Sequence, residues 1–111
     1  MPKTFISTAI PEITHVRLYE ETVEHVCENH PEIPARLPSM TFAVEQTIVD
    51  PTHVEFSHAG AYVFVNTRAT NKSGDPLRVP VKIVEGTSGR IRTFYFASPS
   101  RPLKIVWRKR P

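Results

Sequence analysis

The hydrophobic pattern of this chain changes its period near residues 50–53, and this change strongly limits the fold. Before this point, residues 20–30 and 39–49 carry apolar side chains at helical spacing. After it, apolar and polar residues alternate, which is typical of strands. The chain therefore combines helices in its first half with a sheet in its second half.

Two helices are predicted. The first begins at Glu20 or Glu21 and ends before Pro31, because a residue that precedes proline is disfavoured in the helical conformation. We therefore expect His30 at the exit of this helix, with its ring projecting into a cleft. Ser39 is the expected N-cap of the second helix.

Strand-like segments make up most of the remaining sequence, separated by short turn sequences that favour antiparallel hairpins. They are residues 53–58, 61–68, 77–84, 90–97 and 103–107, with a further short strand at 13–19. We predict an α+β fold in which two N-terminal helices pack on one face of an antiparallel four- or five-stranded meander sheet. A chain of 111 residues is long enough for one domain, here residues 1–111.

Several functional classes are not expected from the composition. No run of 18 apolar residues occurs, and the N-terminus lacks the apolar segment of a secretory signal. We therefore expect a protein without a membrane partner that is cytoplasmic, or is delivered into a target cell as part of a larger toxin. The single cysteine, Cys27, excludes an internal disulfide and fits a small buried hydrophobe better than a nucleophile. The four glycines lie in turns, so a phosphate-binding loop for nucleoside triphosphates is not expected.

The net charge of +3 is unevenly distributed. Residues 12–32 are acidic, whereas most cations lie in the second half of the chain. If these cations share a face, their field favours a polyanion such as RNA. The alternative is that they keep exposed strands soluble and protect sheet edges. The cations of the second half are Arg68, Lys72, Arg78, Lys82, Arg90, Arg92, Arg101, Lys104, Arg108, Lys109 and Arg110.

Residues 20–32 hold two histidines and five carboxylates. A histidine exchanges a proton near neutral pH, and a carboxylate can orient it or act as a base, so this segment has the groups for acid–base chemistry. The alternative is an ordinary amphipathic helix with a solvated acidic face. The spacing of four histidines does not match a metal site, so neither a metal nor another cofactor is expected. These histidines are His25, His30, His53 and His58.

Uninterrupted strand alternation would sort the side chains of residues 77–84 and 90–97 onto two faces. The bulky set should meet the helices, and the other set should line the open face. Two cations beside two hydroxyls on the open face would suit a phosphodiester, although simple β propensity also explains the threonine and the tyrosine. The bulky set is Val79, Val81, Ile83, Phe94 and Phe96, with Arg92 at the same parity. The open-face set is Arg78, Lys82, Thr93 and Tyr95, with Ile91 at the same parity.

The order of several short motifs resembles the phage-associated branch of the BECR nucleases, the superfamily of barnase, EndoU, colicin and RelE-like proteins. The motifs are His25-x4-His30-Pro31-Glu32, a helix ending in Ile48-Val-Asp-Pro51, the strand Leu77-Arg-Val-Pro-Val-Lys82, and Ile91-Arg-Thr93-Phe-Tyr95 after a glycine turn. The resemblance covers residues 13–97. It implies a metal-independent ribonuclease, of a kind often found in toxins and mobile elements, with two helices on an antiparallel sheet.

The resemblance also implies the site. His25 and His30 match the helix histidines of the family, Lys82 matches the strand cation, and Thr93 and Tyr95 match its T-x-Y pair. These five residues are the predicted catalytic residues. Three further cations are predicted to bind the substrate, namely Arg68, Arg78 and Arg92.

The expected reaction is cleavage of RNA by attack of the ribose 2′-OH on the adjacent phosphate, which gives a cyclic phosphate. We expect His30 to act as the base, and Lys82 and Arg78 to stabilise the phosphorane. Thr93 and Tyr95 would hold nonbridging oxygens, and His25 or Tyr95 would protonate the leaving oxygen. The expected partners are RNA and an immunity or antitoxin protein. The alternative is a non-catalytic RNA- or protein-binding module of the same fold.

Overall fold

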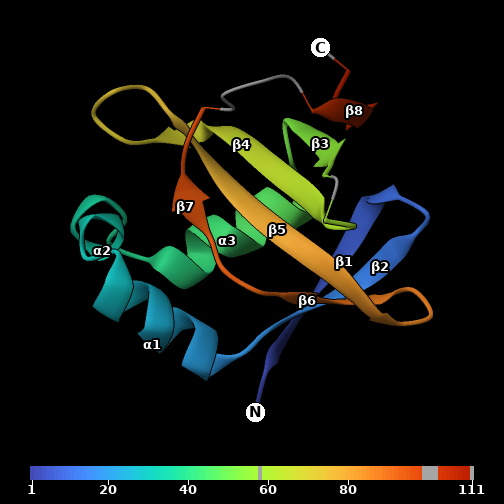
Figure 1. Cartoon of the computed structure of the whole chain (residues 1–111), viewed down its shortest axis with the longest axis horizontal. Helices are drawn as coiled ribbons and strands as arrows, with labels where there is room; N and C mark the ends of the chain where they lie inside the picture. The colour runs from blue at the N-terminus through green and yellow to red at the C-terminus, as the bar shows by residue number, and fades with distance from the viewer. Residues whose placement is uncertain (58, 99–102, 111) are drawn as a thin grey trace.

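The computed structural model of the chain describes residues 1–57, 59–98 and 103–110. His58 and Arg101 therefore lie outside the described residues. Within those residues, eight strands form one curled sheet that packs with three helices (Figure 1). In chain order the elements are β1 (Lys3–Ile10), β2 (Ile13–Leu18), α1 (Glu20–Asn29), α2 (Glu32–Arg36), α3 (Met40–Val49), β3 (His53–Phe56), β4 (Tyr62–Thr70), β5 (Pro76–Glu85), β6 (Ser88–Ile91), β7 (Tyr95–Phe96) and β8 (Lys104–Arg108).

The predicted four- or five-stranded meander with two N-terminal helices is wrong. The β1–β2 hairpin precedes the helices, which therefore lie in the middle of the chain. The strand order is β1-β2-β6-β5-β4-β3-β8, and β7 pairs separately with β5. β2 and β6 run parallel, and β8 returns to pair with β3, so the sheet is neither wholly antiparallel nor a meander.

Strand β1 was not predicted because its burial does not follow its polarity. Ser7 faces inward and is only 2% exposed, whereas the adjacent Ile6 is 54% exposed. A sequence pattern identifies a half-buried strand by apolar residues on the inner face. This strand places a hydroxyl inside and an isoleucine outside, so the pattern gives no clear signal.

The two predicted helices are confirmed as α1 and α3. The hydroxyl oxygen of Ser39 accepts a hydrogen bond from the backbone N–H of Phe42 at 3.4 Å, which caps α3 as expected. Helix α2 lies in a proline-rich stretch for which no helix was predicted. It forms because Pro34 is within the first turn, where a backbone N–H has no intrahelical partner to lose. No helix among the described residues is long and apolar enough to cross a membrane.

The core lies between the helices and one face of the sheet. Helix α3 packs against β1, β4 and β5. Val79 and Val81 of β5 and Phe94 are fully buried in this core, as predicted, whereas Ile83 is 43% exposed. Fully burying side chains of this size stabilises the fold by about 1.5–3 kcal/mol each. The helical members of the core are Val26, Ile33, Val44 and Ile48.

Residues 90–97 do not form the single strand that was predicted. Ile91 pairs with Val81, whereas Tyr95 pairs with Arg78, so the register against β5 shifts by one residue between β6 and β7. One extra residue in a strand is a bulge, and it reverses the alternation of side chains beyond it. Pro80 of β5 lies opposite this interruption, where its carbonyl accepts from the N–H of Arg92 at 3.4 Å, and it has no N–H to donate in return.

Because of the bulge, the predicted assignment of side chains to the two sheet faces is wrong for part of residues 90–97. Ile91 was grouped with Thr93 and Tyr95 on the open face, but it is fully buried in the core. Phe96 pairs with Leu77 beyond the bulge, and Tyr95 pairs with Arg78. Residues 92–94 lie between the two strands, and Phe94 is buried in the core.

Candidate active site

Two adjacent cavities lie beside the corner between α1 and α2. Figure 1 shows α2, β7 and the loop that joins β4 to β5 on the same side of the molecule. The first, which we call the His30 cavity, has a volume of about 480 Å³ and is lined by His30, Glu32, Ile33, Asn71, Thr93, Tyr95 and Phe96. The second, the Arg36 cavity, has a volume of about 490 Å³ and is lined by Glu32, Ala35, Arg36, Asn71, Lys72, Ser73 and Phe96. Glu32, Asn71 and Phe96 line both cavities.

His30 is positioned by the sharp turn between α1 and α2. It is the C-cap of α1, and its backbone N–H donates to the carbonyl of Val26 at 2.7 Å. Its own carbonyl accepts from the N–H of Ile33 at 3.0 Å. Ile33 is 1% exposed and anchors the turn in the core. The corner is therefore fixed by backbone hydrogen bonds and by burial on both sides of Pro31.

The side chains of His30 and Glu32 form a pair at this corner. Nδ1 of His30 lies 3.3 Å from Oε1 of Glu32, and the two side chains are 48% and 64% exposed. The carboxylate of Glu32 therefore lies within ion-pair distance of Nδ1, and the other ring nitrogen, Nε2, is not part of this contact. This arrangement, in which a carboxylate orients a histidine, is suited to a general base.

Thr93 and Tyr95, which are distant from His30 in the sequence, line the same cavity. Both are half-buried, and Tyr95 packs against the core. Within the described part of the chain, neither hydroxyl has a hydrogen-bond partner. The two hydroxyls are therefore free, within that part, to bind an atom placed in the cavity.

Asn71 organises the wall that the two cavities share. Its side-chain oxygen accepts from the backbone N–H groups of Ser73 at 3.0 Å and Asp75 at 2.9 Å. Its amide nitrogen donates to the Asp75 carboxylate at 3.1 Å. Hydrogen bonds from Ser98 and from Asn71 lower the pKa of Asp75, so this carboxylate stays ionised and holds the loop.

Five predicted site residues do not line the His30 cavity, and two of these, Lys82 and His25, are exposed. Lys82 pairs with Arg90 and lies four residues from Arg78, the partner of Tyr95. This separation is about 13 Å along the strand, given a rise of about 3.3 Å per residue. His25 lies on α1, where its Nδ1 is 3.3 Å from the amide nitrogen of Asn29.

Arg78 is not the exposed phosphate-binding cation that was predicted. It is buried, with 4% of its side chain exposed, and it forms an ion pair with the buried Glu55 of β3. Oε2 of Glu55 also lies 2.7 Å from Nε2 of His53. The curled sheet buries both faces at its centre, since Val63 and Val65 on the Arg78 side are buried too. The open sheet face that was expected there is absent from the described structure.

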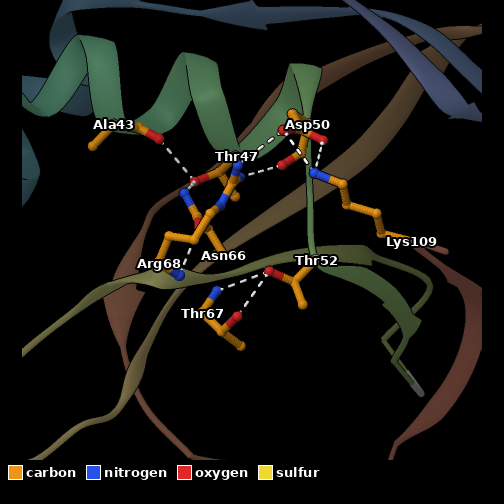
Figure 2. A network of polar contacts seen from close by, with 8 residues as sticks. All are labelled: Ala43, Thr47, Asp50, Thr52, Asn66, Thr67, Arg68 and Lys109. Carbon is orange, nitrogen blue, oxygen red and sulfur yellow. Dashed lines mark hydrogen bonds and ion pairs between the residues drawn. The ribbon is translucent and has the colours of Figure 1, made fainter. Parts of the chain in front are cut away.

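Arg68 is held in a network of polar contacts at the end of α3 (Figure 2). One terminal nitrogen donates to the Asp50 carboxylate at 2.8 Å, another donates to the Asp50 carbonyl, and Nε donates to Asn66 at 3.0 Å. Lys109 binds the same carboxylate at 3.0 Å. Hydrogen bonds from Lys109 and then from Arg68 lower the pKa of Asp50. Arg68 therefore has a structural role, and it lines neither cavity.

The same network ties α3 to β4. The amide nitrogen of Asn66 donates to the hydroxyl of Thr47 at 3.2 Å, and that hydroxyl donates to the carbonyl of Ala43 at 2.8 Å (Figure 2). Arg92, the third predicted substrate-binding cation, is exposed within the bulge and lines neither cavity.

Sequence reasoning missed several residues of the two cavities. Glu32 was quoted in a motif but was given no role in the site. The sequence feature that could have identified Glu32 is its position two residues after His30, on the other side of the proline that ends α1. Arg36, Asn71 and Lys72 had no sequence signal, because only the tertiary structure brings α2 beside the β4–β5 loop.

Comparison with known proteins adds no identification. No protein-family model, curated protein sequence or solved structure matches the chain. Across residues 1–57, 59–98 and 103–110, no group of three or more His, Cys, Asp or Glu side chains is placed to hold a metal ion. Inferences about function therefore depend on the geometry of the His30 cavity and the Arg36 cavity.

Proposed function

We propose that this chain is a metal-independent ribonuclease whose active site is the His30 cavity. The observation that carries the proposal is the convergence of a carboxylate-paired histidine with the side chains of Thr93 and Tyr95 in one cavity. A base, an acid and a hydrogen-bond donor are the groups needed to cleave a phosphodiester through its own 2′-OH. The motifs that resemble those of the phage-associated BECR nucleases contribute residues to this same cavity, which supports the proposal.

In this mechanism, Nε2 of His30 takes the proton of the ribose 2′-OH, and Glu32 stabilises the imidazolium that forms. The 2′ oxygen bonds to phosphorus as the bond to the 5′ oxygen breaks, and the product is a cyclic phosphate. The phenol of Tyr95 gives its proton to the leaving 5′ oxygen. The hydroxyl of Thr93 donates to a nonbridging oxygen, where negative charge develops. Proton exchange with water then restores His30 and Tyr95.

The structure changes the predicted source of positive charge. Lys82 and Arg78 were expected to stabilise the phosphorane, but neither lines the cavity. Arg36 and Lys72 lie in the adjoining cavity, so in the proposal they supply positive charge beside the scissile phosphate and do not contact the phosphorane itself. Such an enzyme would act on RNA in the cytoplasm, or in a target cell after delivery within a larger toxin. An immunity or antitoxin protein would then inhibit it by covering the His30 cavity.

A non-catalytic RNA-binding module is the second candidate. It is favoured by the exposure of the acid–base pair, since His30 is 48% and Glu32 is 64% exposed. Electrostatic catalysis is strongest where water is excluded, and this pair is hydrated. In this alternative, the cations bind the RNA backbone and His30 completes the end of α1.

The two candidates are separated by incubating the protein with a 5′-labelled oligoribonucleotide in the presence of a chelator. The enzyme should release fragments that end in a 2′,3′-cyclic phosphate, and it should leave the DNA of the same sequence intact. His30→Ala should lower the rate by about a hundredfold or more, because it removes the base.

His25→Ala is the matched control. It removes an exposed histidine of the same helix that lies outside the cavity, so it should cleave like the wild type. Intact RNA at high protein concentration, or equal cleavage by wild type and His30→Ala, would exclude the proposed active site.

A further inference from the structure

The Arg36 cavity has the size and the position of a ligand subsite beside the His30 cavity. Its volume of about 490 Å³ lies within the range of about 300–1,000 Å³ that is usual for ligand pockets. Glu32, Asn71 and Phe96 form the wall between the two cavities. A polymer bound with one phosphate beside His30 would therefore extend into this second cavity.

Phe96 gives the shared wall an aromatic surface. Its backbone pairs with Leu77 of β5, and its half-buried ring packs against the core. The ring is therefore held by the sheet while it lines both cavities. A fixed, partly exposed aromatic ring is a stacking surface for a nucleobase that is free of its own base stack.

Two cations lie around the same cavity. Nε of Arg36 donates to the carbonyl of Thr70 at 2.8 Å, which fixes the guanidinium at the wall. Lys72 projects from the loop that Asn71 organises. In the part of the chain that is described, neither Lys72 nor the terminal nitrogens of Arg36 pair with a carboxylate. Glu32 is the one carboxylate of the described cavity lining, and it is paired with His30.

We propose that the Arg36 cavity binds the nucleotide next to the scissile phosphate of single-stranded RNA. Its base stacks on Phe96, and its phosphate is bound by Arg36 and Lys72. This inference rests on the proposed function for its position relative to the scissile bond. It names the substrate class, because a duplex keeps its bases stacked and cannot place one against Phe96.

The test measures binding separately from cleavage. A fluorescent 2′-O-methyl oligoribonucleotide cannot be cleaved through its blocked 2′ oxygen, so fluorescence anisotropy reports its affinity alone. The wild type should bind the single strand at least tenfold more tightly than the same strand in a duplex. Phe96→Leu should weaken single-strand binding about tenfold, because it removes the stacking surface. Arg36→Ala should lower the salt dependence by about one counterion.

Substitutions at Ala35 provide a test that does not depend on the core. Ala35 is exposed on α2 and lines the cavity, so a longer side chain there can point to solvent without unfolding the protein. Ala35→Glu should weaken binding by repelling the phosphate, and Ala35→Lys should strengthen it. Arg92→Ala, which removes an exposed cation outside both cavities, is the control. This variant should bind the single-stranded oligoribonucleotide at least about threefold more tightly than the Arg36→Ala variant does.

The two proposals fail in different ways. If substitutions at Phe96 and Ala35 change the binding affinity but the wild type does not cleave RNA, the proposed ribonuclease activity is wrong and the proposed subsite stands. If the wild type cleaves RNA but the Arg36→Ala and Ala35→Glu variants bind the oligoribonucleotide as tightly as the wild type, the proposed ribonuclease activity stands and the proposed subsite is wrong. Equal affinity for single strand and duplex would also overturn it.

Discussion

Nδ1 of His30 lies 3.3 Å from a carboxylate oxygen of Glu32, and Pro31 separates the two residues in the sequence. The carboxylate can therefore fix the orientation of the imidazole directly at the turn between α1 and α2. The pair lines one cavity together with Thr93 and Tyr95, which come from a distant part of the sequence.

Glu32→Gln should lower the rate of RNA cleavage by about tenfold, a smaller loss than that of His30→Ala. The amide no longer stabilises the imidazolium that forms when His30 takes the proton. Single-turnover rates on a labelled oligoribonucleotide measure the loss. Glu28→Gln, an exposed change on α1 outside the cavity, is the control. An unchanged rate in Glu32→Gln would show that the pair has no catalytic role.

Tyr95→Phe should slow cleavage of ordinary RNA by about a hundredfold, because the leaving 5′ oxygen then lacks its proton donor. A nucleoside 3′-(p-nitrophenyl phosphate) has a leaving group that departs without a proton, so the variant should cleave it almost as fast as the wild type. Steady-state rates on both substrates test this. Equal losses on the two substrates would contradict a role as general acid.

Glu55→Gln should lower the free energy of unfolding by about 3–5 kcal/mol, because it leaves the charge of Arg78 buried without its partner. Only 4% of the Arg78 side chain and 6% of the Glu55 side chain are exposed. Urea denaturation monitored by circular dichroism measures the loss. Glu85→Gln removes an exposed carboxylate of β5 and should change stability by less than about 0.5 kcal/mol. Comparable stability in the two variants would show that the buried ion pair is not needed.

Asp50→Asn should destabilise the protein at pH 7 but not at low pH. The hydrogen bonds from Lys109 and Arg68 lower the pKa of Asp50 in the folded protein. A lowered pKa stabilises the fold above the unfolded-state pKa of about 4, and this contribution disappears as the pH falls through the folded-state pKa. Thermal unfolding of both proteins from pH 7 to pH 2 should show the difference shrinking below about pH 4. A constant difference would contradict this contribution.

Gly89→Ala should lower stability by about 1–3 kcal/mol through overpacking. A methyl group at this position would lie 2.5 Å from Cγ1 of Val81 and 3.2 Å from the backbone oxygen of Lys82. The double variant Gly89→Ala with Val81→Ala tests the cause, since shortening Val81 removes the closest clash. Its loss should be smaller than the sum of the two single losses. Additive losses in denaturant would show that the contact with Val81 is not responsible.

Local sequence signals determined two of the three helices and the position of His30. Ser39 caps α3 through its own side chain, and Pro31 ends α1 because its ring restricts the residue before it. Such signals act within one helical turn, so they can be interpreted without knowing the rest of the fold. They also place Glu32 two residues beyond His30.

The tertiary structure decided the sheet and the identity of the residues that share the site. The parallel pairing of β2 with β6 depends on contacts between segments that are distant in the sequence. A one-residue bulge opposite Pro80 moved Ile91 into the core, and a curled sheet buried Arg78 against Glu55. Alternation is a local rule, and a single extra residue reverses it for everything that follows. The sequence thus determined where the helices begin and end, whereas long-range packing determined which side chains meet.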